Sequence, residues 1–181
     1  MLYRLSLLAI FSFVGLTANA QPGPGNRLAS SEFAGTAPRN ASWDKLAQLG
    51  GSWRLANPKS RAEKAFRIRM RPISKITALL ETFGNPAGIT TETVYHRDGD
   101  SIMATHYCAQ GNQPRLLLSP TSAPGTLSFR FHDITNLTSK ANAHLIRLDF
   151  KLIDDDHLER RETYTQNGIT EESVLRLTRV W

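Results

Sequence analysis

The sequence contains a single cysteine, Cys108, so no disulfide bond can form within the chain. A packed core, rather than covalent cross-links, therefore has to hold the fold together. Apart from one apolar run near the N-terminus, no stretch is long and apolar enough to cross a membrane as a helix. The chain also lacks a glycine-rich phosphate loop, a Gly-x-Ser-x-Gly motif and a catalytically spaced pair of carboxylates. Nothing in the sequence therefore supports the common nucleotide-binding or hydrolase classes.

The charge excess is modest, with 22 basic and 16 acidic residues and a formal net charge of +6. Basic residues are scattered among acids, and Arg67, Arg69 and Arg71 alternate along one stretch. Such alternation is typical of the solvated face of a strand. A nucleic-acid surface would need a larger excess and interleaved aromatic side chains. We therefore expect no nucleic-acid partner.

The N-terminus has the three parts of a secretory signal peptide. Arg4 gives a basic start, residues 5–16 are apolar, and Ala18 and Ala20 are small residues suited to a cleavage site. We predict a signal peptide over residues 1–20, a flexible Pro/Gly-rich leader over 21–41 and one domain over 42–181. The protein is expected in the periplasm or secreted, with no integral membrane segment after the signal peptide is removed.

Beyond a short helix that starts near Ser42 and stops at Gly50, apolar residues recur with period two. The alternation predicts eight to ten antiparallel strands joined mostly by short turns. Asp98-Gly99 and Asn167-Gly168 are strong signals for tight hairpin turns. Strands of this number must close or pack face to face to hide their edges. We predict an all-β, antiparallel up-and-down barrel, with a Greek-key sandwich as the alternative.

Residues 51–53 (Gly-Ser-Trp), between the predicted helix and the first strand, resemble the Gly-x-Trp signature of the calycin superfamily. That group includes lipocalins, fatty-acid-binding proteins and nitrobindin-like barrels. The resemblance implies a lipocalin-like barrel whose tryptophan plugs the closed end under a basic residue of the last strand. Arg176 and Arg179 are the two candidates for that residue. The Thr-Asp-Trp-like turn and the disulfide of typical lipocalins are absent.

A second resemblance rests on residues 98–100 (Asp-Gly-Asp), 105–108 (Thr-His-Tyr-Cys) and 111–115 (Gly-Asn-Gln-Pro-Arg). These blocks resemble an uncharacterised family of small, often exported bacterial proteins, over roughly residues 46–179. The resemblance implies a lipocalin-like barrel and no established activity, so it supplies no catalytic residues.

Four residues could give the barrel interior a polar lining. His106 and Cys108 lie two apart on a predicted strand and share a face with Ile102 and Ala104, which indicates the interior. By the same alternation we expect His144, which shares parity with Ile146, Leu148 and Phe150, and Tyr95 to point inward. Buried polar groups cost roughly 1–3 kcal/mol each when unpaired, so each needs a partner or a ligand.

Three further residues complete the candidate ligand-binding set. Gln113 and Arg115 follow a loop that could rim the barrel mouth, and Glu81 lies within an apolar run. The favoured function is binding of a small hydrophobic or amphiphilic molecule. The alternatives are an enzyme that uses His106, Cys108 or Tyr95, a haem- or metal-binding barrel, and ordinary core residues paired with their neighbours. No group of candidate ligands has a known metal-binding spacing, so we assign no metal. The sequence also assigns no cofactor and no oligomeric state.

Overall fold

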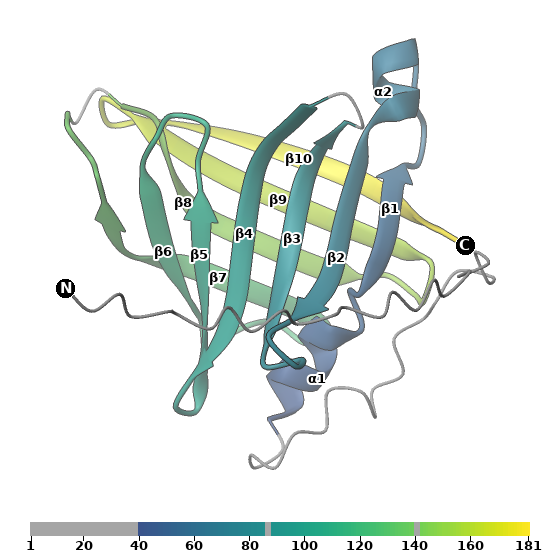
Figure 1. Cartoon of the computed structure of the whole chain (residues 1–181), viewed down its shortest axis with the longest axis horizontal. Coiled ribbons are helices and arrows are strands. Elements are labelled where there is room, and N and C mark those ends of the chain that lie inside the picture. Colours follow the sequence, from purple (N-terminus) through teal and green to yellow (C-terminus); the bar gives the residue numbers. More distant parts are fainter. Residues whose placement is uncertain (1–39, 86–87, 140–141) are drawn as a thin grey trace, which may run out of the picture.

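The structure is a computed structural model, and it describes residues 40–85, 88–139 and 142–181. Ten antiparallel strands follow one another around a closed barrel, with β1 and β10 meeting where the sheet closes (Figure 1). This confirms the predicted up-and-down barrel. The expected signal peptide and nearly all of the expected leader lie outside the described residues. The elements are α1 (Ala41–Ala47), β1 (Gly51–Leu55), α2 (Arg61–Ala65), β2 (Arg67–Ile73), β3 (Ala78–Asn85), β4 (Gly88–Asp98), β5 (Ser101–Tyr107), β6 (Gln113–Leu118), β7 (Thr126–Thr135), β8 (His144–Leu152), β9 (His157–Gln166) and β10 (Ile169–Val180).

Both hairpin signals in the sequence mark real turns. Asp98-Gly99 ends β4, and Gly99 has a positive φ of 58°. Asn167 and Gly168 join β9 to β10 with φ values of 51° and 77°. Two successive positive φ angles are what a type I′ turn requires, and Asn-Gly adopts them at low cost. No helix in the described part of the chain has the length and apolarity needed to span a membrane.

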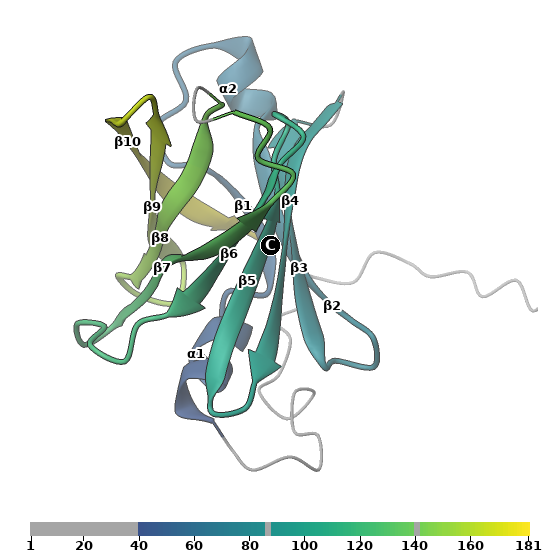
Figure 2. The ribbon, with the colours of Figure 1, turned by 90° about the vertical axis from the view of Figure 1, so that its left-hand side faces the viewer.

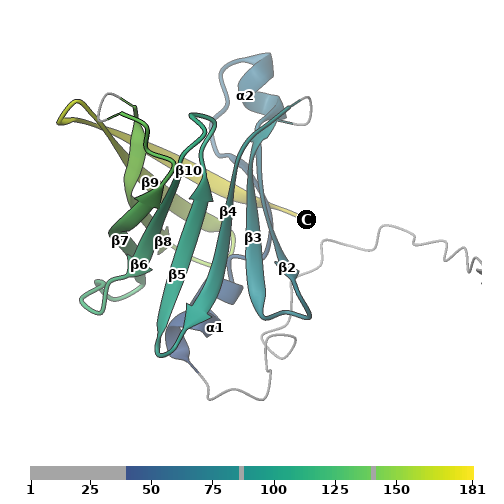
Figure 3. The same cartoon turned by 60° about the vertical axis from the view of Figure 1, so that its left-hand side comes forward.

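Helix α1 lies across one end of the barrel, and α2 lies at the opposite end (Figures 2 and 3). The helix predicted to start near Ser42 begins at Ala41. Asn40 is the N-cap, and its Oδ1 accepts hydrogen bonds from the backbone N–H groups of Ser42 (3.0 Å) and Trp43 (3.1 Å). Asn40 also donates to the carbonyl of Asp100 at 2.9 Å, which fastens the start of the helix to the β4–β5 turn.

Helix α2 has no counterpart in the sequence predictions. Ser60 caps it, and its hydroxyl accepts from the N–H of Glu63 at 3.1 Å. None of its five residues is buried. It therefore carries no apolar stripe, which is the signal that sequence periodicity detects.

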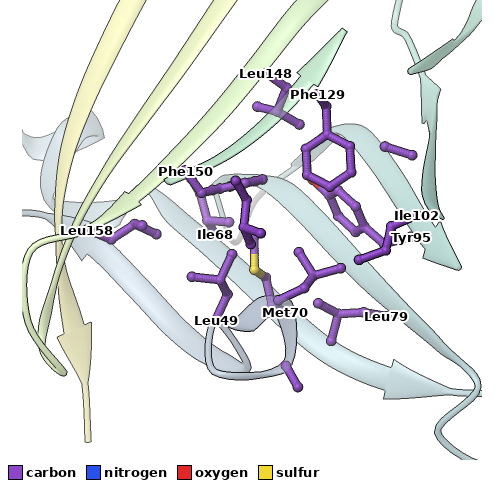
Figure 4. Packing of buried hydrophobic residues seen from close by; sticks show 14 of the residues in the cluster. Leu49, Ile68, Met70, Leu79, Tyr95, Ile102, Phe129, Leu148, Phe150 and Leu158 are labelled. Carbon is purple, nitrogen blue, oxygen red and sulfur yellow. The ribbon is translucent and has the colours of Figure 1, made fainter. Parts of the chain in front are cut away.

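The apolar core fills the end of the barrel beneath α1 (Figure 4). The helix contributes Leu46, and Leu49 follows it; both are fully buried. Strands from around the barrel supply the rest of the packing, and these side chains come together in the close-up. They include Ile68, Met70, Leu79, Tyr95, Ile102, Phe129, Leu148, Phe150 and Leu158.

Trp53 plugs this closed end, and Arg179 of β10 lies across its ring at 4.1 Å from guanidinium carbon to ring centroid. Trp53 Nε1 donates to the carbonyl of Leu49 at 2.9 Å. Arg179 donates from Nε to the carbonyl of Asp155 (2.8 Å), from Nη1 to Gly50 (2.6 Å) and from Nη2 to Gln48 (2.9 Å). Of the two candidates, Arg179 is therefore the basic residue that covers the tryptophan.

Replacing Arg179 by lysine should destabilise the protein by roughly 2–4 kcal/mol. A lysine keeps the charge, but its three N–H donors share one nitrogen and cannot reach carbonyls that lie around a planar guanidinium, so buried acceptors lose their partners. Urea unfolding followed by circular dichroism measures the change. The matched control is Arg176→Lys on the same strand, where the side chain is 81% exposed and the expected change is below about 0.5 kcal/mol. Equal effects of the two substitutions would contradict the role assigned to Arg179.

Candidate functional site

A row of polar side chains crosses the inner face of β3, β4 and β5. Glu81 pairs with Thr93, and Thr93 pairs with His106, so the three residues lie directly opposite one another on the same face of the sheet. Their exposed fractions are 0%, 2% and 0%. Strand register alone therefore places a carboxyl, a hydroxyl and an imidazole side by side inside the barrel.

Strand β9 supplies polar groups to the same interior. Leu158 is buried opposite Leu177, which identifies the inward face of β9, and Arg160, Glu162 and Tyr164 follow at two-residue spacing. Arg160 Nη2 lies 2.8 Å from Glu81 Oε1, and Arg160 Nη1 lies 2.8 Å from Glu162 Oε1. We call the seven interior polar residues the lumen cluster: Glu81, Thr93, Tyr95, His106, Arg160, Glu162 and Tyr164.

Arg160 is the centre of the lumen cluster and is 1% exposed. Its guanidinium lies over the rings of Phe83 (4.8 Å) and Phe150 (5.7 Å). Its contacts with the two carboxylates are close but not aligned as hydrogen bonds, and its Nε has no partner among the described residues. Burial lowers the pKa of Arg160, but the attraction of Glu162 and Glu81 outweighs burial and raises it. The arginine is therefore a permanent buried cation.

Glu81 also accepts a hydrogen bond from the hydroxyl of Tyr95, which is fully buried. Burial raises the pKa of Glu81, while Arg160 and the Tyr95 hydrogen bond oppose that rise. Burial and the neighbouring Glu81 charge raise the pKa of Tyr95 well above its ordinary value. Tyr95 therefore remains a neutral donor.

His106 bridges the two sides of the barrel. Its Nδ1 lies 2.9 Å from the hydroxyl of Thr93, and its Nε2 lies 3.1 Å from the hydroxyl of Tyr164. Burial lowers the pKa of His106 to about 4, although the nearby charge of Glu162 acts in the opposite direction. The imidazole is therefore neutral at physiological pH, and both of its nitrogens already have hydrogen-bonding partners.

Exposure increases from the α1 end of the barrel toward the α2 end. On the inward face of the β9–β10 pair, Leu158 and Leu177 are about 2% and 1% exposed. Farther along, Glu162 is 8% exposed and the inward Ser173 opposite it is exposed. Within the described pairing, β1 meets only residues 177–180 of β10, so residues 169–175 of β10 have a strand neighbour on the β9 side alone. Solvent therefore reaches inward-facing positions at the α2 end, which we call the open end.

Three of the seven residues proposed from sequence are brought together: Glu81, Tyr95 and His106 all belong to the lumen cluster. Cys108 lies just past the end of β5 and is half-buried in the β5–β6 turn. Its backbone bonds Asn112 and Gly111, and its Sγ accepts weakly from the N–H of Gln110 at 3.5 Å. No hydrogen bond joins Cys108 to His106 in the described residues.

Gln113 and Arg115 lie on the opposite face of β6 from the buried Pro114 and Leu116. Arg115 forms a two-pronged ion pair with Asp133, and each of these side chains is 40% exposed. Gln113 accepts from the hydroxyl of Thr135 at 2.9 Å and donates to the carbonyl of Gly111 at 3.0 Å. The structure therefore places both residues outside the lumen cluster.

His144 does not follow the alternation that was expected to carry it inward. The register of β8 shifts between Leu145 and Arg147, so Leu145, which is fully buried, pairs with the inward Tyr164. His144 is half-buried beside Phe131, with 5.7 Å between ring centroids. The expectation that His144 shares the inward face of Leu148 and Phe150 is wrong, because a bulge reverses the alternation between them.

Sequence reasoning did not single out Thr93, Arg160, Glu162 and Tyr164. The signal for the last three was present, since they continue the alternation that begins at Leu158. Charged residues at strand positions usually mark the solvated face, so their spacing alone does not indicate a buried site. Two hollows, of about 660 Å³ beside α1 and about 430 Å³ on the outer face of β7–β9, include no residue of the lumen cluster.

A search against protein-family models returns no match, and a search of curated proteins returns none either. Within the described ranges, no group of three or more histidine, cysteine, aspartate or glutamate side chains is placed to hold a metal ion. The geometry of the barrel interior is therefore the basis for a functional interpretation.

The pKa of His106 makes stability depend on pH in a defined window. As the pH falls from about 6.5 toward about 4, His106 becomes protonated in the unfolded chain but stays neutral in the folded protein. The free energy of unfolding therefore decreases over this range. The free energy of unfolding should drop by roughly 2–3 kcal/mol between neutral pH and the lower part of this window. Urea unfolding across that range should show this drop shrinking in His106→Asn. His132→Asn, at a 47% exposed position, should behave as wild type; an unchanged pH dependence in His106→Asn would refute the assignment.

Proposed function

We propose that this chain is an exported, lipocalin-like barrel protein that binds a small hydrophobic or amphiphilic molecule through the open end. The closed barrel, with Trp53 under Arg179 at one end, supports membership of the calycin group. The observation that carries the proposal is the lumen cluster. Its polar groups span the barrel from β3–β5 to β9, which is more polarity than packing a small barrel requires.

The arrangement favours binding over catalysis. Both nitrogens of His106 are engaged, by Thr93 and by Tyr164, so a general base at this position would first have to lose a partner. A binding site needs only what the interior offers, which is an apolar base and a few polar groups nearer the opening.

Binding should depend on access through the open end. Ser173 is an exposed, inward-facing residue of β10 opposite Glu162, so Ser173→Trp should obstruct the interior. We expect this substitution to weaken binding of the neutral dye Nile red roughly tenfold, a loss of about 1.4 kcal/mol. A fluorescence titration of the purified protein measures the affinity.

The matched control is Val174→Trp, at the neighbouring residue, which faces outward opposite Arg161 and is 41% exposed. It should leave Nile red affinity unchanged. Equal effects of the two tryptophans, or no dye binding by the wild-type protein, would count against a ligand site in the barrel.

Export should be visible as removal of residues 1–20. Expression of the full chain in a Gram-negative bacterium should yield a periplasmic protein whose intact mass begins at Gln21. Ala20→Lys should block this processing, because the cleavage site needs a small residue there, whereas Asn19→Gln should be processed normally. A protein that keeps residues 1–20 and stays in the cytoplasm would refute export.

A further inference from the structure

The part of the barrel interior nearer the open end is acidic, although the protein as a whole is basic. The lumen cluster contains two carboxyl groups, Glu81 and Glu162, and a single cation, Arg160. Glu171 adds a third carboxylate at the open end, because it lies directly opposite the inward-facing Tyr164. These four groups together are negative even if Glu81 holds a proton, while the chain as a whole carries a formal charge of +6. The neutral His106 adds no positive charge.

Glu162 lies nearer the open end than Arg160 on β9, opposite the exposed Ser173. Its Oε1 contacts Arg160, and its Oε2 has no polar contact among the residues the structure describes. The side chain is 10% exposed, so little water screens it. Burial lowers the pKa of His106 and raises that of Tyr164; the charge of Glu162 opposes the first shift and adds to the second. A half-engaged, nearly buried carboxylate is an acceptor for a cationic or hydrogen-bond-donating group.

Arg160, by contrast, is not available to an anionic ligand. Its two terminal nitrogens face Glu81 and Glu162, and the ring of Phe83 covers its plane at 4.8 Å. Within the described residues the guanidinium forms no aligned hydrogen bond, but each terminal nitrogen lies 2.8 Å from a carboxylate oxygen. A ligand carboxylate could form the paired bonds that arginine favours only at nitrogens that already face Glu81 or Glu162. A ligand carboxylate would therefore have to displace a protein carboxylate and remain beside another.

We propose that the barrel selects amphiphiles with a positively charged, amine-bearing head and rejects those with a carboxylate. This inference rests on the proposed function. The head group lies beside Glu162 and Glu171, and the apolar tail lies within the barrel. Phe66, at the C-terminus of α2, and Phe83 of β3 have rings that meet edge to face at 5.0 Å and add aromatic surface.

The test compares dodecylamine, dodecanol and dodecanoate, which share one chain length and differ in head-group charge. Each is titrated, below its micelle concentration and at neutral pH, against wild-type protein loaded with Nile red. We expect dodecylamine to bind at least roughly tenfold more tightly than dodecanoate, with dodecanol between them.

Variants locate the source of the selectivity. Glu162→Gln and, at the exposed entrance, Glu171→Gln should each reduce the preference for amine over carboxylate several-fold. Glu171→Gln keeps the test valid if Glu162→Gln does not fold. Glu172→Gln is the matched control, because Glu172 is the neighbouring residue on the outer face, paired with Arg161 at 2.9 Å. Its amine preference should equal that of the wild type.

The outcomes separate this inference from the proposed function. Tightest binding of dodecanoate, or equal binding of all three compounds, would overturn the charge selectivity and leave the barrel as a ligand site. Failure of Nile red and of all three amphiphiles to bind would instead refute the proposed function itself. An amine preference that survives in both Glu162→Gln and Glu171→Gln would show that these carboxylates do not produce it.

Discussion

The junction between β1 and β10 is the constraint on which the rest of this structure depends. Every other pair of neighbouring strands is also consecutive in the chain, whereas this pair joins the two ends of the barrel domain. Only four residue pairs, residues 52–55 with 177–180, form the ladder there. Arg179 reinforces it by bonding the backbone on both sides of the closure and by covering Trp53. Because the side chains of a strand alternate between faces, the register at this junction decides which residues line the interior.

Closure gives the interior its electrostatic character. Once the sheet is a barrel, groups on β3–β5 face groups on β9 across a space with little water, and charges there interact strongly. Arg160 is held by two carboxylates and two aromatic rings, and His106 is kept neutral by its burial. The chain could not form these contacts without the barrel, since Glu81 and Arg160 lie far apart in the sequence.

Much of the fold could be predicted from the sequence, because each signal was local. Period-two alternation, Asp98-Gly99 and Asn167-Gly168 act over a few residues, and they identified the strands and turns. Glu81, Tyr95 and His106 were found because each lies in an uninterrupted strand. His144 was misplaced because a bulge reverses the alternation, and nothing in the sequence marks that bulge. Arg160 and Glu162 were missed because charged residues in a strand usually mark its solvated face, and because Glu81, the second partner of Arg160, lies on β3, which only closure brings near.

The lumen cluster is not explained by stability. The same barrel fills other interior positions with Leu148, Phe150 and Leu158, so the fold accommodates apolar side chains there without difficulty. A buried ion pair often contributes no more stability than apolar residues of similar volume, because desolvation offsets its attraction. Each member of the cluster also needs its neighbours, since removal of one partner leaves another charge buried and unpaired. Because apolar side chains could fill these positions at little cost in stability, the presence of the cluster supports the binding role proposed above.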